Sequence, residues 1–282
     1  MQNRVLLIGE FITNKGYGLL GDTITTAALG GTPVISTPSI TCVSEETTTQ
    51  SLPIDFTRQQ LRACFTDPGV DAVKLGSVVS GPFMKQFADC IVDNQIDVPI
   101  VFNPIISSES REVLITKGVL ADLQQYLYPI TTLMILSTQD IDHFISGKVS
   151  DRASIIEAAG EINRHGPRNV YVTGTIPETG EPINILVSDS HKSAKYQELC
   201  PDRTQAATGT WALSSAIATF LSRGLDLQTA IAYGHQFVNT AFGESSENLH
   251  EDFQRLNLIH TIGIFQPDTA QTAPWQALEM AS

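Results

Sequence analysis

The feature that most constrains the fold is a series of short apolar runs, each closed by glycine, proline or polar residues. Such runs are typical of strands that are buried on both faces of a sheet. Many of them are separated by segments in which apolar residues recur with the period of an amphipathic helix. Strands alternating with helices indicate βαβ units and right-handed crossovers. The predicted class is therefore α/β, a three-layer fold with helices on both faces of a mostly parallel central sheet.

The apolar runs place the predicted strands at 5–8, 33–35, 39–43, 72–75, 100–102, 133–136, 170–172 and 183–187. The helical period places the predicted helices at 57–66, 83–95, 110–128, 151–165, 211–223 and 226–242. In such a sheet, ligands bind beyond the carboxyl ends of the strands. Functional residues are therefore expected in the segments that directly follow the strands.

The chain contains no Ser/Gly-rich linker, charge block or internal repeat, so residues 1–264 are predicted to form one domain. With 282 residues, 42% of them hydrophobic, the chain is long enough to bury a full core. Residues 265–282 are polar and contain proline, which is typical of a tail that lies loosely on the surface.

Charge and cysteine content narrow the class of partner. A net charge of −13 predicts repulsion from nucleic acid and from anionic membranes. No apolar run approaches the roughly 18 to 20 residues of a membrane span, and the first residues show no signal-peptide pattern. The four cysteines lie far apart without a CxxC pair, which fits a reducing compartment. We expect a cytoplasmic protein whose main partner is neither nucleic acid nor a membrane.

Two common catalytic arrangements are not favoured. The six histidines show neither HxH nor HExxH spacing, so no metal-ligand set is predicted. No GxSxG motif is present to support Ser/His/Asp hydrolysis. Ser214 and Ser215 lie inside a predicted helix, where serine usually packs or bonds back to the preceding turn.

A glycine-rich segment follows the first predicted strand. Gly16, Gly18 and Gly21 would let the backbone approach a flat ligand closely. Asp22, at the start of the next helix, either caps that helix alone or also accepts hydrogen bonds from a ligand. The acidic pair that begins at Glu45 is either a solvated turn or an acceptor for an aminopyrimidine or hydroxymethyl group.

The strongest local signal is the small-residue loop at 206–210, which runs into a helix predicted from Trp211 to Ser222, with Thr210 as N-cap. Free backbone N–H groups and the positive end of the helix would converge there, as they do where proteins bind phosphate. In phosphoryl transfer, such a point stabilises charge on the moving group. The alternative is an ordinary entry from loop to helix.

Together these segments resemble the hydroxymethylpyrimidine and phosphomethylpyrimidine kinases of thiamine synthesis, in the ribokinase-like superfamily. The resemblance covers residues 4–245. It rests on GYGLLGD at 16–22 (family GAGIQAD), AALG at 27–30 (SALG), SEET at 44–47 (AQNT), DAVKLG at 71–76 (DxxKIGM), VFNP at 101–104 (VLDP) and the loop at 207–218 (GTGCTLSAALA).

The resemblance implies a ribokinase-like fold, use of ATP and Mg²⁺, and phosphorylation of the hydroxymethyl group of hydroxymethylpyrimidine or its monophosphate. It also implies association into a homodimer, as is common among related kinases. Carried over by position, it places Gly18, Asp22 and Glu45 around the pyrimidine. Glu45 replaces the family's glutamine, so it accepts hydrogen bonds but cannot donate them.

The same resemblance places an anion hole at the backbone of Thr208, Gly209 and Thr210. The family's catalytic cysteine, which is aspartate in sister kinases, falls on Thr210 or Trp211.

On the nucleotide side the family's Asn-x-x-Glu falls near Thr138, with Asp140 beside it, and its phosphate-contacting lysine falls on Thr173. A threonine hydroxyl is a poor proton acceptor near neutral pH. Two alternatives therefore accompany the kinase hypothesis. One is a catalytically impaired protein that binds a pyrimidine, vitamin or nucleotide, and the other is a pyridoxal or sugar kinase of the same superfamily.

Overall fold

The computed structural model describes residues 3–13, 18–43, 47–66, 68–78, 80–104, 116–188, 195–199, 210–243 and 275–277. The strands in these ranges are β1 (Arg4–Ile8), β2 (Phe11–Thr13), β3 (Thr32–Ser36), β4 (Ser39–Cys42), β5 (Thr48–Ser51), β6 (Ala72–Leu75), β7 (Ile100–Phe102), β8 (Leu133–Ser137), β9 (Asn169–Thr175), β10 (Pro182–Ser188), β11 (Lys195–Leu199) and β12 (Trp275–Ala277).

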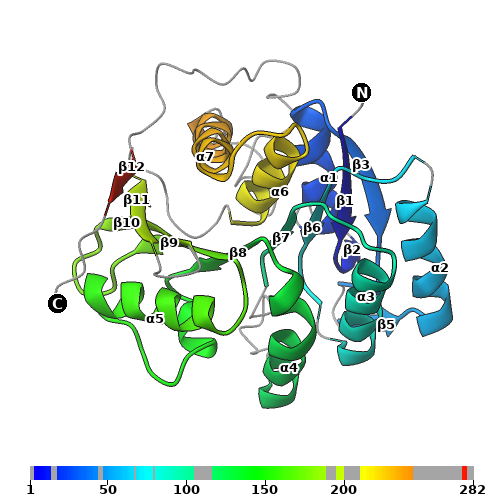
Figure 1. Cartoon of the computed structure of the whole chain (residues 1–282), viewed down its shortest axis with the longest axis horizontal. Coiled ribbons are helices and arrows are strands. Elements are labelled where there is room, and N and C mark those ends of the chain that lie inside the picture. Colours follow the sequence, from blue (N-terminus) through cyan, green and yellow to red (C-terminus); the bar gives the residue numbers. More distant parts are fainter. Residues whose placement is uncertain are drawn as a thin grey trace.

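Within the described residues the main sheet has nine strands, in the order β12-β11-β10-β9-β8-β7-β6-β1-β3 (Figure 1). The strands from β3 to β9 pair in parallel. From β9 to β12 the pairing is antiparallel. A small sheet of β2, β4 and β5 accompanies it. The predicted α/β class with a mostly parallel central sheet is confirmed.

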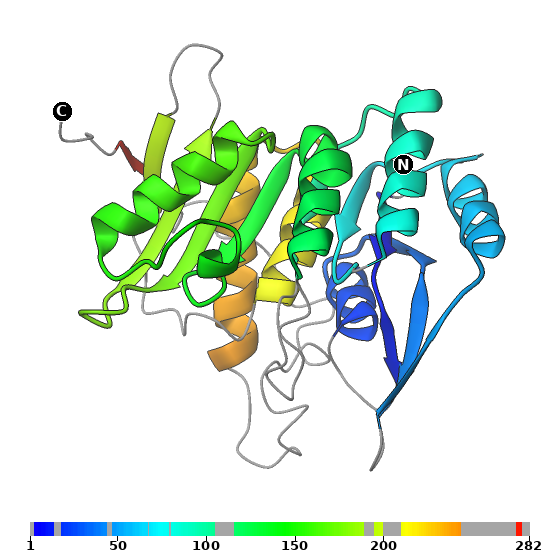
Figure 2. The same cartoon turned by 90° about the horizontal axis from the view of Figure 1, so that it is seen from below.

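Helices cover both faces of the main sheet. They are α1 (Leu19–Ala28), α2 (Ile54–Phe65), α3 (Gly81–Asp93), α4 (Lys117–Asp122), α5 (Arg152–Arg164), α6 (Thr210–Leu221) and α7 (Leu227–Gly243). Figure 2 shows α2 to α5 on one side of the sheet and α1, α6 and α7 on the other. We call these two sides the α3 face and the α6 face.

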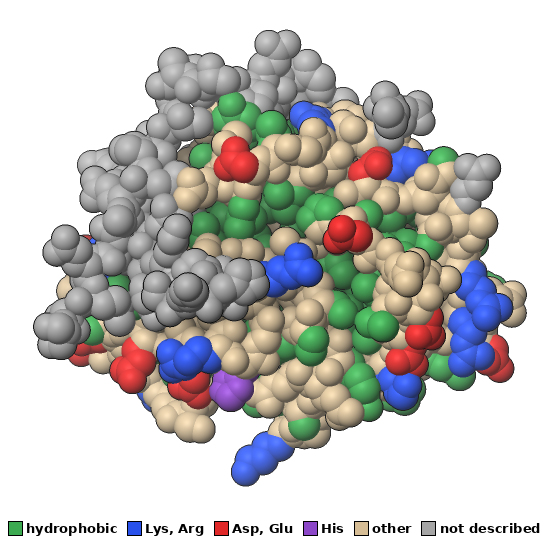
Figure 3. Space-filling model, viewed as in Figure 1, with side chains coloured by type: hydrophobic (Ala, Val, Ile, Leu, Met, Phe, Trp, Pro, Cys, Tyr) green, Lys and Arg blue, Asp and Glu red, His purple; other side chains and the backbone are tan. Residues whose placement is uncertain are grey.

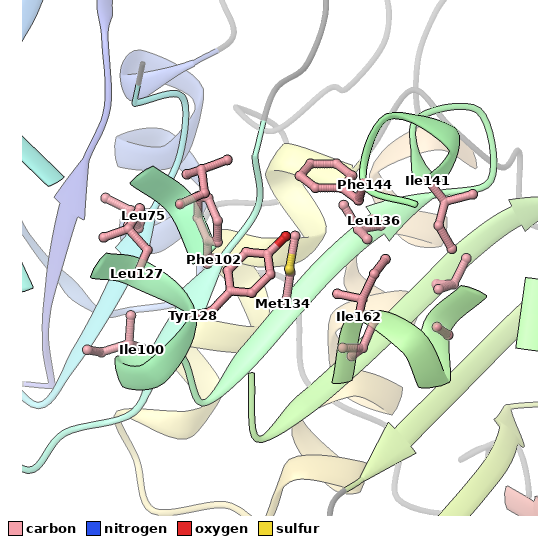
Figure 4. Close-up of a cluster of buried hydrophobic side chains, with 14 of the residues drawn as sticks. Leu75, Ile100, Phe102, Leu127, Tyr128, Met134, Leu136, Ile141, Phe144 and Ile162 are labelled. Atoms are coloured by element: carbon pink, nitrogen blue, oxygen red, sulfur yellow. The ribbon is translucent and has the colours of Figure 1, made fainter. Parts of the chain in front are cut away.

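The described core divides into one hydrophobic cluster on each face. Successive side chains of a strand point to opposite faces, so Leu6 and Ile8 join the cluster on the α3 face, and Val5 and Leu7 join the cluster on the α6 face. Figure 4 shows part of the α3-face cluster. Because both faces are covered, the central strands read as continuous apolar runs.

Each predicted strand is present, with two differences in context. The run at 39–43 forms β4 in the small sheet, and the run at 183–187 forms β10, which pairs antiparallel. The sequence did not predict β2, β5, β11 and β12. Strand β5, with the sequence TTQS, is exposed throughout and carries no apolar pattern.

The helix predicted at 110–128 differs most from the structure. Its described part begins at 116, and α4 ends at Asp122. A π-helical turn, Leu123–Leu127, and a 3-10 turn, Tyr128–Ile130, follow. A proline at position 129 cannot donate the backbone hydrogen bond of a continuing helix.

Three residues of the predicted C-terminal tail form β12, which pairs with β11, and the rest of 265–282 lies outside the described residues. In the part of the chain that the structure describes, no helix is long and apolar enough to span a membrane. On the face shown in Figure 3, the described acidic and basic side chains are interspersed.

Candidate functional site

Helices α1 and α6 lie side by side on the α6 face and run in the same direction. The Ser215 hydroxyl donates to Asp22, and the Thr219 and Thr26 hydroxyls are 3.5 Å apart. One turn further along, the Arg223 guanidinium donates to the Leu29 carbonyl. Residue numbers rise together along this contact, so both helices begin at the same end.

That end is the carboxyl edge of the parallel strands. Gly18 precedes α1 with φ of 66°, in the region that favours glycine. A Cβ atom at Gly18 would lie 3.6 Å from the carbonyl oxygen of Glu10, which follows soon after β1. The backbone at Gly18 is therefore close to the end of β1, as expected for a ligand-facing glycine turn, whereas Gly16 lies outside the described residues.

Asp22 does not cap α1, although both predictions for this residue assumed that it does. It is the fourth residue of α1, and the Gly18 N-cap of that helix has no side-chain capping bond among the described residues, so the capping interpretation is wrong. Its side chain is only 1% exposed. One carboxylate oxygen pairs with the Lys74 ammonium, and the other accepts the Ser215 hydroxyl at 2.7 Å. That Asp22 contacts a ligand directly stays a prediction.

Burial raises the pKa of Asp22 above its ordinary value, and the charge of Lys74 and the hydrogen bonds from Lys74 and Ser215 oppose that rise. A carboxylate removed from water is stable in the charged form only beside such partners. Asp22 and Lys74 can therefore stay buried and charged only as a pair.

Lys74 is the residue of this site that sequence reasoning missed. It is 1% exposed in the middle of β6 and pairs in register with Leu7 and Val101, whose side chains belong to the α6-face core. A Cβ atom at Gly76 would lie 2.9 Å from the Lys74 ammonium nitrogen. The one available signal was a cation inside the apolar run 72–75, because a buried cation requires a partner.

Helix α6 begins at Thr210, one residue earlier than predicted, so Thr210 lies in its first turn. Thr210 and Trp211 are partly buried. The Trp211 carbonyl accepts the hydroxyls of Ser214 at 2.8 Å and Ser215 at 3.1 Å, which confirms that these serines bond back to the preceding turn. Thr208, Gly209 and Glu45 lie outside the described residues.

The residues predicted on the nucleotide side come together at the ends of β8 and β9. The Thr138 N–H donates to the Thr173 carbonyl at 3.0 Å, and the Thr138 hydroxyl accepts the Thr175 N–H at 3.2 Å. The Thr173 hydroxyl donates to the Asn184 side chain on β10, at 2.6 Å. Thr138 and Thr173 are 4% and 6% exposed, so their hydroxyls face protein rather than solvent.

Asp140 lies just beyond β8 and is partly buried. The Ser137 hydroxyl donates to one of its carboxylate oxygens at 2.6 Å. A carboxylate in such a place fits Mg²⁺, which commonly takes one or two carboxylates together with substrate phosphates. Among the described residues there is no cluster of three or more His, Cys, Asp or Glu that would hold a metal without such a substrate.

Asn103 adds a buried acceptor to the same edge, directly after β7. Its side-chain amide donates to the Ile135 carbonyl at 3.1 Å, and its backbone N–H donates to the Leu75 carbonyl at 2.9 Å. Asn103 is 4% exposed, and its side-chain oxygen has no partner among the described residues. A buried acceptor of this kind is costly unless a donor reaches it.

Comparison with known proteins places this arrangement in a family. The family model described as "Phosphomethylpyrimidine kinase" matches residues 14–255. The chain belongs to the phosphomethylpyrimidine kinase family. The family and its relatives are kinases, and the resemblance of the sequence to the phosphomethylpyrimidine kinases is confirmed.

Relatives and solved structures agree with this membership. The chain is 26% identical over 239 residues to the thiamine biosynthesis bifunctional protein ThiED of Geobacter sulfurreducens, covering 84% of this chain and 48% of that protein. It is 23% identical over 244 residues to the hydroxymethylpyrimidine/phosphomethylpyrimidine kinase of Mycobacterium leprae, covering 83% of this chain and 86% of that one. The chain thus spans about half of the bifunctional relative and most of the shorter one.

In fold, the chain is similar to the pyridoxal kinase of Staphylococcus aureus in complex with ADP. The TM-score is 0.79 at 18% identity, covering 99% of this chain and 100% of that one.

Proposed function

We propose that this protein is an ATP-dependent kinase that phosphorylates the hydroxymethyl group of hydroxymethylpyrimidine or of its monophosphate. The observation that carries the proposal is the joint start of α1 and α6 at the carboxyl edge of the sheet. A glycine turn that can approach a flat ring then lies beside a helix end that can hold phosphate. Membership of a kinase family and the named relatives support the same activity.

In this proposal, the pyrimidine and the phosphoryl group are bound by different residues. The first N–H groups of a helix have no partner within that helix, and the helix dipole places positive charge at the same point. In this proposal the N–H groups at Thr210 and Trp211, completed by Thr208 and Gly209, bind the phosphoryl group. Gly18 and Glu45 would contact the pyrimidine.

The nucleotide would bind over the ends of β8 and β9, where Thr138, Asp140 and Thr173 lie together. Asp140 is the described carboxylate that would hold Mg²⁺. When bound with ATP, Mg²⁺ supplies positive charge that neutralises the phosphate oxygens. The chain's own contribution is to position the two substrates and to offer backbone donors.

One observation favours a second candidate, a catalytically impaired protein that binds a pyrimidine, vitamin or nucleotide. Thr210 and Trp211 occupy the start of α6, where the family resemblance would place cysteine or aspartate. Neither side chain is an effective general base at neutral pH. A positioned base contributes about 10² to 10⁴-fold, so its absence would lower turnover more than binding.

The similarity in fold to a pyridoxal kinase supports pyridoxal as an alternative substrate of the same site. Pyridoxal also carries a hydroxymethyl group on a flat nitrogen ring. Asn103, a buried acceptor at the same edge, would favour any substrate that brings a hydroxyl or amino donor.

Incubation with Mg·ATP separates these candidates. Purified protein receives hydroxymethylpyrimidine, its monophosphate or pyridoxal, and mass spectrometry detects ADP and the phosphorylated product. We expect phosphorylation of a pyrimidine above the level of pyridoxal. The absence of any product at high enzyme concentration would overturn the kinase proposal. Thermal stabilisation by the pyrimidine, without stabilisation by Mg·ATP, would then support the binding protein.

A further inference from the structure

Helix α6 is buried on all sides over most of its length. The residues from Ala212 to Phe220 are buried, and most of them pack into the α6-face core. Hydrophobic burial is not directional, so it fixes the place of this helix less strictly than hydrogen bonds do. The polar contacts between α6 and α1 can therefore fix the position of α6 along its axis, and its rotation about that axis, relative to α1.

Those contacts differ along the helix. Near the start, Ser215 reaches the carboxylate of Asp22 at 2.7 Å, and that carboxylate is held by Lys74 of β6. A turn later, the Thr219 hydroxyl donates within α6 to the Ser215 carbonyl at 2.8 Å and lies 3.5 Å from Thr26. The contact that joins α6 to both α1 and the sheet is thus the one nearest the proposed phosphate-binding end.

The buried pair is a poor device for stability alone. Removing two charges from water costs several kcal/mol per ion, and apolar residues of similar volume often stabilise a core as well or better. What a buried pair adds is a defined geometry, because each partner left alone is strongly destabilising. Asp22 can define such a geometry, because its two carboxylate oxygens bond to two different elements, β6 and α6.

We propose that Ser215, Asp22 and Lys74 are positioning residues that set the start of α6 against the glycine turn before α1. This inference rests on the proposed kinase function, and it assigns Asp22 a role beneath the site rather than at the substrate. Ser215 and Asp22 are 193 positions apart in the chain, and Asp22 and Lys74 are 52 apart. The three residues therefore link the substrate-side helix, the sheet and the phosphate-side helix.

The chain offers a matched pair of variants for the test. Ser214 and Ser215 are neighbours, both are fully buried, and both donate to the Trp211 carbonyl. Ser215 alone of the two donates to Asp22. Ser215→Ala and Ser214→Ala therefore remove the same group from the same helix turn and differ in the link to α1.

Steady-state kinetics with both substrates provide the first measurement. We expect Ser215→Ala to lower kcat about 10- to 100-fold, because a misplacement of the order of 1 Å can cost that much. The KM values should change little, since the groups that touch the substrates remain. Ser214→Ala should keep kcat near the wild-type value. Equal losses of kcat in the two variants would overturn the proposal.

Hydrogen exchange provides a measurement that does not depend on turnover. Ser215→Ala should increase amide exchange in both α1 and α6, because the bond between them is lost, whereas Ser214→Ala should affect α6 alone. If wild-type protein shows no kinase activity, the proposed function fails and exchange alone decides the positioning role. Increased exchange confined to α6 in both variants would overturn that role.

Discussion

The two faces of the sheet hold their helices in different ways. On the α3 face the buried contacts are largely between apolar side chains such as Phe83, Phe87 and Phe102. On the α6 face, an ion pair and a tyrosine–histidine bond lie among the apolar groups. The proposed site lies at the start of α1 and α6, two of the three helices on the α6 face.

The two kinds of contact contribute differently: apolar packing mainly stabilises the core, and buried polar bonds mainly restrict how the elements are arranged. Close-packed apolar groups stabilise a core, but similar side chains can replace one another at modest cost. Buried polar groups tolerate few arrangements, since an unmade bond costs about 1–3 kcal/mol. The apolar cluster of the α3 face is thus expected to tolerate loss of a polar atom, and the ion pair and the tyrosine–histidine bond of the α6 face are not.

The largest effect is expected from Lys74→Met, which leaves the Asp22 carboxylate buried without its cation. Breaking a buried pair in this way costs about 3–5 kcal/mol. Adding Asp22→Leu should recover most of that loss, because the double variant buries no unpaired charge. Urea unfolding of the two single variants and the double variant measures the coupling between the two positions.

The pH dependence of Lys74→Met sharpens this test. Burial already raises the pKa of Asp22, and without Lys74 less opposes that rise. A carboxyl whose folded pKa is raised contributes most below its unfolded pKa and loses that contribution as pH rises. The variant should therefore approach wild-type stability as the pH is lowered. A constant difference between the two proteins at every pH would contradict this account.

A smaller effect is expected at His235 on α7, again on the α6 face. Its ring nitrogen lies 2.7 Å from the Tyr171 hydroxyl, and burial lowers the pKa of His235 to about 4. The unfolded chain binds a proton near pH 6.5 and the folded protein does not, so stability falls as the pH drops through that range. Between pH 7.5 and 5 the loss should be about 2 kcal/mol.

His235→Gln keeps a group that can hydrogen bond to Tyr171 but cannot titrate. Unfolding of both proteins between pH 5 and 7.5, where most carboxylates stay charged, checks the prediction. As the pH falls from 7.5 to 5, the free energy of unfolding of the variant should decrease less than that of the wild type, because the variant has no histidine to protonate at this position. Parallel pH profiles for the variant and the wild type would show that His235 binds its proton with the same pKa in the folded and the unfolded protein.

The fold could be predicted from local sequence where burial leaves a local signal. The run at 72–75 and the run at 100–102 coincide with β6 and β7 because central parallel strands are buried on both faces. Strand β5 could not be predicted in this way. Its polar residues are held by pairing with β4, which is a tertiary contact rather than a local preference.

The candidate site shows the same limit. The glycine turn at Gly18 and the start of α6 at Thr210 could be predicted, to within a residue, from residues next to one another. The partners of Asp22 could not, because Ser215 lies 193 positions away and only folding brings the two together. Lys74 signalled that a buried partner must exist but not which residue it is.

The smallest effect is expected from Tyr128→Phe on the α3 face. Figure 4 shows the Tyr128 ring inside the apolar cluster, with its oxygen directed among the neighbouring side chains. That hydroxyl is buried without a hydrogen-bond partner among the described residues, and burial raises the pKa of Tyr128. Because no bond is lost, its removal should leave the free energy of unfolding unchanged or raise it by up to about 1 kcal/mol. A loss of more than about 1 kcal/mol in urea unfolding would mean that the hydroxyl is hydrogen-bonded in solution, as through a buried water, and that the α3 face also depends on polar contacts.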